Sequence, residues 1–150
     1  MPDEVEISRL EELFPGLRTG AWEISSPADK KYNCIAYAAG DSTRWWWPGF
    51  PGDVYWPPRA LQSLDIRSFV DAYGTIGFER CDDDSLESGF EKIALFVDGE
   101  GLPTHAARQL PDGRWTSKLG KLQDIVHELT ELEGREYGKI TCFLKRTRTS

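Results

Sequence analysis

The amino-acid sequence predicts a single α+β domain in which a short, buried, cysteine-bearing helix packs against a central antiparallel sheet. Two patterns support this fold class. Residues 90–118 form apolar and alternating runs separated by turns, as an antiparallel meander requires, and three other segments have apolar residues at helical spacing. A chain of 150 residues can bury roughly two thirds of its surface, so residues 1–150 are expected to form one domain with its core at about 32–145.

Charge and composition exclude several classes of protein. The formal net charge of -7 repels phosphate backbones, so nucleic acid is not an expected partner. No apolar run approaches roughly 18 residues and the N-terminal stretch MPDEVEISRLEELF is acidic, so neither a membrane span nor a signal peptide is expected. The expected location is the cytoplasm, with delivery as an effector left open. Cys34, Cys81 and Cys142 form no CxxC pair, so neither a disulfide framework nor a zinc site is indicated, and no metal or cofactor is expected.

The three segments with helical spacing are predicted to be helices. Residues 4–14 begin with acidic side chains and stop at Pro-Gly, which predicts an N-terminal docking helix. Residues 60–73 predict the second main helix, and residues 121–133 predict a third. His127 falls within this third segment, where a lone histidine is expected at the surface or as a cap.

The sheet is expected from short runs rich in apolar and β-branched residues. The turn at Pro111-Asp112-Gly113 joins two of these runs into a hairpin, after which Trp115 is expected to be buried. The expected strands lie near residues 76–81, 92–98, 104–110, 114–118 and 138–145.

The stretch YNCIAYAAG at residues 32–40 predicts a short buried helix with Cys34 in its first turn. The N-terminal end of a helix favours the thiolate form of a cysteine, and a nearby imidazole activates it further. Of the two histidines, His105 opens a strand after a loop and is the better candidate base. The predicted chemistry is therefore a thiol hydrolase with a Cys34 nucleophile and a His105 base, acting on an amide, isopeptide or thioester bond. The ordinary alternative is that Cys34 is a small core residue.

Further residues complete this predicted site. The Asn33 side chain, with the Cys34 backbone N–H, is the candidate holder of the oxyanion. Strand alternation across the hairpin brings Ser117 to the face of His105, and a register slip of one residue would substitute Lys118. Asp124 is the carboxylate alternative for orienting the histidine, and Asp98 is a lesser one.

The order of these parts resembles the papain-like cysteine peptidase superfamily, including NlpC/P60-type amidases. In that superfamily a nucleophile at a helix start precedes an antiparallel sheet that carries the histidine and then a polar orienter. The blocks YNCIAYA and THAARQLPDGRWTSKLG also resemble those of a family of small uncharacterised bacterial proteins, over about residues 32–140. The resemblance implies a papain-like fold and a peptide or other amide-containing substrate. One departure is Ala28, which stands where papain-type enzymes carry the oxyanion-hole glutamine.

Residues 44–58 are too rich in tryptophan, proline and glycine to form a regular element, which predicts a structured aromatic loop. Trp45, Trp46 and Trp47 either stabilise the core or line a groove that stacks a peptide or sugar ring. Two alternatives to the hydrolase follow. One is a non-enzymatic binding module, which requires a Trp-lined groove and a buried, unpaired Cys34; the other is an adaptor or immunity protein that binds a protein partner through its acidic surface.

Overall fold

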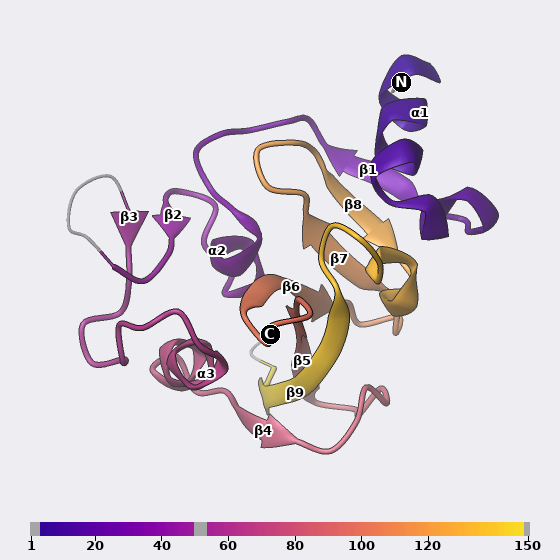
Figure 1. Ribbon diagram of the computed structural model, residues 1–150. Helices are drawn as coiled ribbons and strands as arrows, with labels where there is room; N and C mark the ends of the chain where they lie inside the picture. The colour runs from indigo at the N-terminus through magenta and orange to yellow at the C-terminus, as the bar shows by residue number, and fades with distance from the viewer. Residues whose placement is uncertain (1–3, 50–53, 149–150) are drawn as a thin grey trace.

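A computed structural model describes residues 4–49 and 54–148, and it is a mixed α+β structure built on an antiparallel sheet (Figure 1). Within these residues seven strands pair in the order β1-β8-β7-β6-β5-β9-β4. Every neighbouring pair in this sheet is antiparallel. Its strands are β1 (Glu23–Ser26), β4 (Glu79–Cys81), β5 (Phe90–Val97), β6 (Pro103–Gln109), β7 (Trp115–Lys118), β8 (Asp124–His127) and β9 (Lys139–Thr147).

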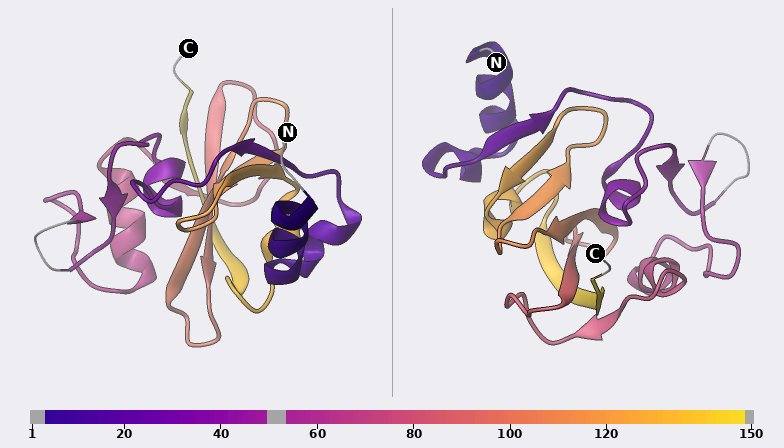
Figure 2. Two further views of the ribbon diagram at one scale, coloured as in Figure 1. Left: turned by 90° about the horizontal axis from the view of Figure 1, so that it is seen from above. Right: turned by 180° about the vertical axis from the view of Figure 1, so that it is seen from behind.

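Helices and short elements cover both faces of the sheet, as Figure 2 shows in its view from above. One face carries the helices α2 (Cys34–Ala38) and α3 (Ile66–Gly74) together with the short parallel pair β2 (Trp45–Trp46) and β3 (Val54–Tyr55). The other face carries α1 (Glu4–Leu13) and the 3-10 helices η1 (Pro15–Thr19) and η2 (Leu129–Leu132). In the part of the chain that is described, no helix is long and apolar enough to cross a membrane.

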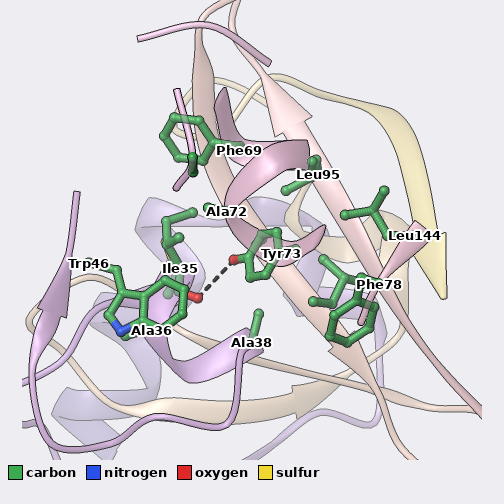
Figure 3. Close-up of a cluster of buried hydrophobic side chains, with 14 of the residues drawn as sticks. Ile35, Ala36, Ala38, Trp46, Phe69, Ala72, Tyr73, Phe78, Leu95 and Leu144 are labelled. Atoms are coloured by element: carbon green, nitrogen blue, oxygen red, sulfur yellow. Dashed lines mark hydrogen bonds between the residues drawn. The ribbon is translucent and has the colours of Figure 1, made fainter. Parts of the chain in front are cut away.

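Strand alternation divides the interior into two apolar cores. Along β5, Ile93 and Leu95 point into the first core, beneath α2 and α3, whereas Ala94 and Phe96 point into the second. In the first core the Tyr73 hydroxyl donates a 2.8 Å hydrogen bond to the carbonyl of Ile35, which ties α3 to α2 (Figure 3).

The expected strands near 76–81, 92–98, 104–110, 114–118 and 138–145 correspond to β4, β5, β6, β7 and β9. The helix expected over 60–73 is shorter and begins after Asp65, whose carboxylate accepts hydrogen bonds from the backbone N–H groups of Arg67 and Ser68.

The prediction of a helix over residues 121–133 is wrong. Residues 124–127 form β8, which pairs with both β7 and β1, and only residues 129–132 are helical. A four-residue strand followed by a 3-10 turn reproduces the apolar spacing of a helix, so the local pattern was ambiguous. Pairing on both edges decides the conformation, and the β1 strand that completes it was not expected.

Candidate functional site

Cys34 is the first residue of α2, as the sequence predicted, and Asn33 caps the helix. The Asn33 side-chain oxygen accepts hydrogen bonds from the backbone N–H groups of Ala36 and Trp46, both at 3.1 Å. Its amide nitrogen donates to the Trp46 carbonyl at 2.8 Å. Asn33 is 2% exposed, and its side chain is fully used in connecting the aromatic loop to the N-terminal end of the helix. The oxyanion role predicted for Asn33 is not supported by this geometry.

The Cys34 thiol lies in the first core and is only 6% exposed. Burial raises its pKa to about 11, although hydrogen bonding to the backbone of Ala106 acts in the opposite direction. The effect of burial on the pKa of this thiol is therefore larger than the lowering expected from its position at a helix N-terminus. Cys34 is a neutral, buried thiol at pH 7.

The predicted Cys34–His105 pair is not formed. His105 pairs with Phe96 across β6 and β5, on the face of the second core, whereas its neighbour Ala106 faces Cys34 in the first core. The His105 ring stacks on Tyr137 with centroids 4.0 Å apart, and neither ring nitrogen has a hydrogen-bond partner among the described residues. Burial lowers the pKa of His105 well below its usual value. The sheet thus separates the proposed base from the thiol.

Ser117 instead contacts the other histidine. Its hydroxyl lies 2.8 Å from Nε2 of His127, and Nδ1 of His127 lies 2.7 Å from the Glu128 carbonyl. Because a carbonyl only accepts, Nδ1 carries the proton and the Ser117 hydroxyl donates to Nε2. Both side chains are buried, and burial lowers the pKa of His127 to about 4. The surface position expected for His127 is wrong, because β8 carries it inward.

Asp124, the alternative orienter, lies on the face of Cys34 and not on that of His105. Its carboxylate accepts hydrogen bonds from Tyr32 at 3.0 Å and from Ser25 at 2.6 Å. It therefore ties the segment before α2 to the sheet.

Lys118 and Asp98, the other two candidates for orienting the histidine, make hydrogen bonds to backbone groups instead. The Lys118 ammonium donates to the carbonyls of Asp29 and Gly120, each at 2.6 Å. Asp98 accepts the backbone N–H groups of Glu100 and Leu102 in the turn after β5. Neither side chain is hydrogen-bonded to the ring of His105. No group of three or more metal-ligating side chains occurs within the described ranges.

The three consecutive tryptophans have different environments. Trp46 is buried, donates to the Asp41 carboxylate at 2.9 Å and packs on Tyr73, so it is a core residue. Trp45 and Trp47 are half-buried, and of these two Trp47 lines a surface hollow.

We call this feature the aromatic hollow. It has a volume of about 320 Å³ and is lined by Trp47, Gly49, Val54, Tyr55, Trp56, Pro58 and Gln62. The rings of Trp47 and Trp56 both meet Phe69 of α3 edge-on, with centroid separations of 5.5 and 5.0 Å. The indole of Trp56 is held further by donation to the Leu61 carbonyl. Of these lining residues, only Trp47 was predicted from the sequence to contact a ligand. The density of tryptophan and proline at residues 54–58 was the signal that could have identified the others.

Fold and site thus define a small α+β domain with a closed, thiol-containing core and an aromatic hollow on its surface. The chain belongs to the family described as "Domain of unknown function (DUF7689)", whose model matches residues 23–145. No curated protein and no solved structure matches the chain.

Proposed function

We propose that this protein is a non-enzymatic binding module that holds a peptide segment of a protein partner in the aromatic hollow. The observation that supports it is the arrangement of Trp47, Tyr55 and Trp56 around an open hollow of about 320 Å³. That volume is at the lower end of ligand sites, which run from roughly 300 Å³, and it suits a few side chains better than a large cofactor.

The two walls formed by Trp47 and Trp56 are preorganised. Phe69 is fully buried and supports both tryptophan rings from behind, so the rings lose little freedom when a ligand binds. Leu61, whose carbonyl accepts the hydrogen bond of the Trp56 indole, is 50% exposed and adds apolar surface next to that wall. Rigid aromatic walls of this kind favour an extended segment that contains proline, because the apolar pyrrolidine ring packs against aromatic faces and the backbone of such a segment is already ordered.

The exposed Gln62 amide at the rim supplies both a donor and an acceptor for the backbone of such a segment. A proline-containing segment has carbonyl groups that are not used within its own helix, since the polyproline conformation has no internal hydrogen bonds. The hollow therefore offers apolar stacking and a polar contact side by side.

Fluorescence titration with a proline-rich decapeptide tests this proposal. We expect Trp47→Ala to weaken binding at least about tenfold, because aromatic anchors at the centre of an interface dominate its affinity. Trp45→Ala is the matched control, since Trp45 adjoins Trp47 in sequence but does not line the hollow. Equal affinity of the two variants, or no binding by the unaltered protein, contradicts the proposal. Binding of an oligosaccharide in place of the peptide would assign the hollow to a sugar.

The thiol hydrolase with a papain-like arrangement is the competing proposal. Its support is the position of Cys34 at the first turn of a capped helix. It requires a rearrangement that brings a base from the second core to the thiol, and labelling of Cys34 distinguishes the two proposals.

A further inference from the structure

A fixed positive charge lies beside the aromatic hollow. The guanidinium carbon of Arg44 is 3.5 Å from the centroid of the Tyr55 ring, a separation at which the cation stacks on the ring face. Tyr55 is one of the residues that line the hollow. Arg44 directly precedes β2, and Trp46 of β2 pairs with Tyr55 of β3, so this strand pairing brings the charge to the hollow.

The Asp41 carboxylate holds Arg44 in this position. Its Oδ2 atom accepts hydrogen bonds from Nε of Arg44 at 2.8 Å and from the Trp46 indole at 2.9 Å. Its Oδ1 atom accepts from the backbone N–H of Thr43 at 2.8 Å and from the Thr43 hydroxyl at 2.6 Å. A carboxylate has about four acceptor positions, so these four donors use Asp41 completely. Its side chain is 15% exposed and serves as an anchor for Arg44.

The outer N–H groups of Arg44 are left for a ligand. A guanidinium has five N–H donors in a planar fork, and among the described residues only the Nε donor of Arg44 has a hydrogen-bond acceptor. The side chain is 51% exposed, so the Nη1 and Nη2 groups are accessible. The Tyr55 hydroxyl likewise makes no hydrogen bond within the described ranges and is a further donor at this side of the hollow.

The fixed position of Arg44 matters for its affinity. A freely moving surface arginine loses conformational freedom when it forms an ion pair, and this loss offsets much of the attraction. Arg44 is already held along one edge by Asp41 and on one face by Tyr55, so less freedom is lost on binding. A planar guanidinium also matches a carboxylate through two parallel hydrogen bonds, which a lysine ammonium cannot make.

We infer that the segment bound in the aromatic hollow carries an acidic side chain next to its proline, and that Arg44 binds this carboxylate and so determines which segments are accepted. The inference rests on the proposed function and names the class of ligand for the same site. The formal net charge of -7 repels acidic segments over most of the surface, so their recognition requires a local cation of this kind.

A set of proline-rich decapeptides with acetylated and amidated ends tests the inference. Each is made in two forms that differ only in Asp or Asn at one position flanking the prolines, and the position is moved from pair to pair. We expect the unaltered protein to bind the Asp form of at least one pair about threefold or more tightly at about 0.15 M salt, as suits an exposed but preorganised ion pair. In Arg44→Gln the ratio for that pair should fall to about one. Tryptophan fluorescence measures all the affinities.

Two further variants separate the fixed guanidinium from charge alone. Arg59→Gln removes the same charge from an exposed residue beside Pro58, which lines the hollow, and Arg59 has no ion pair or ring contact in the described part of the chain. It should keep the preference for Asp. Arg44→Lys keeps the charge but not the planar fork, and should recover only part of the preference.

The possible results distinguish this inference from the proposed function. Equal binding of the Asp and Asn forms in every pair overturns the inference and leaves the binding module standing, whereas failure of every peptide to bind overturns both. Loss of the preference in Arg59→Gln, or its full recovery in Arg44→Lys, also overturns the inference, because charge alone would then account for the selection.

Discussion

The Ser117 hydroxyl and the His127 imidazole lie 2.8 Å apart on neighbouring strands and are sealed from solvent. Such a pair is a familiar nucleophile and base when it faces a cleft. Here it is buried in the sheet, with Trp115 of the second core paired opposite His127 across β7 and β8. The contact therefore satisfies two buried polar groups, and its consequence is a dependence of stability on pH.

We expect His127 to make the protein sensitive to acid. Its folded pKa of about 4 lies below its ordinary value of 6.5, so the unfolded chain binds a proton more readily. The stability contributed by the neutral ring is complete above pH 6.5 and is lost as the pH falls toward 4. The loss is on the order of 3 kcal/mol, since one pKa unit corresponds to about 1.4 kcal/mol. Urea unfolding of His127→Gln at pH 7, 5 and 4 should show a shallower pH dependence; an unchanged slope would contradict this assignment.

We expect Cys34 to resist alkylation. Its buried thiol with a pKa of about 11 should react with iodoacetamide far more slowly at pH 8 than the partly exposed Cys81 does, and should react fully only after unfolding. Site-resolved mass spectrometry measures both rates in one sample. Rapid labelling of Cys34 below pH 8, abolished in His105→Ala, would support the thiol hydrolase and count against the binding module.

Trp115→Ala should cost about 3–5 kcal/mol of unfolding free energy. Trp115 is 3% exposed in the second core, so truncation leaves a cavity that the surrounding strands cannot close. The measurement is the denaturation midpoint in urea. Trp45 is half-buried, so Trp45→Ala should lower the unfolding free energy clearly less. If Trp115→Ala lowers it no more than Trp45→Ala does, the sheet relaxes around the cavity.

Asn33→Ala should destabilise the protein by about 2–4 kcal/mol, because it removes the cap of α2 and leaves polar groups of Trp46 without partners. Asn33→Ser should recover part of this loss, since a serine hydroxyl still caps the helix. Thermal unfolding of the three proteins checks the order. If Asn33→Ser is no more stable than Asn33→Ala, the cap contributes little and the link to Trp46 accounts for the effect.

The sequence by itself determined the α+β class and the positions of five strands, because alternation and turn residues are local signals. It also determined that Cys34 starts a capped helix, since Asn33 and the small residues after it act within one turn. It did not determine β8, where the apolar spacing of residues 122–129 suits a helix as well as a strand and a turn. Hydrogen bonding to β1 and β7 resolved that ambiguity.

Only the tertiary structure decided which chemical groups meet. His105 and Ala106 are consecutive, so a single step along β6 places one beside Tyr137 in the second core and the other beside Cys34 in the first. The same alternation places the Ser117 hydroxyl within hydrogen-bond distance of His127, and the Asp124 carboxylate within hydrogen-bond distance of Tyr32. Side chains in a strand point to opposite faces with a period of two, and the register with neighbouring strands selects the face that each residue shares. That register depends on pairing between distant segments, which the local sequence does not specify.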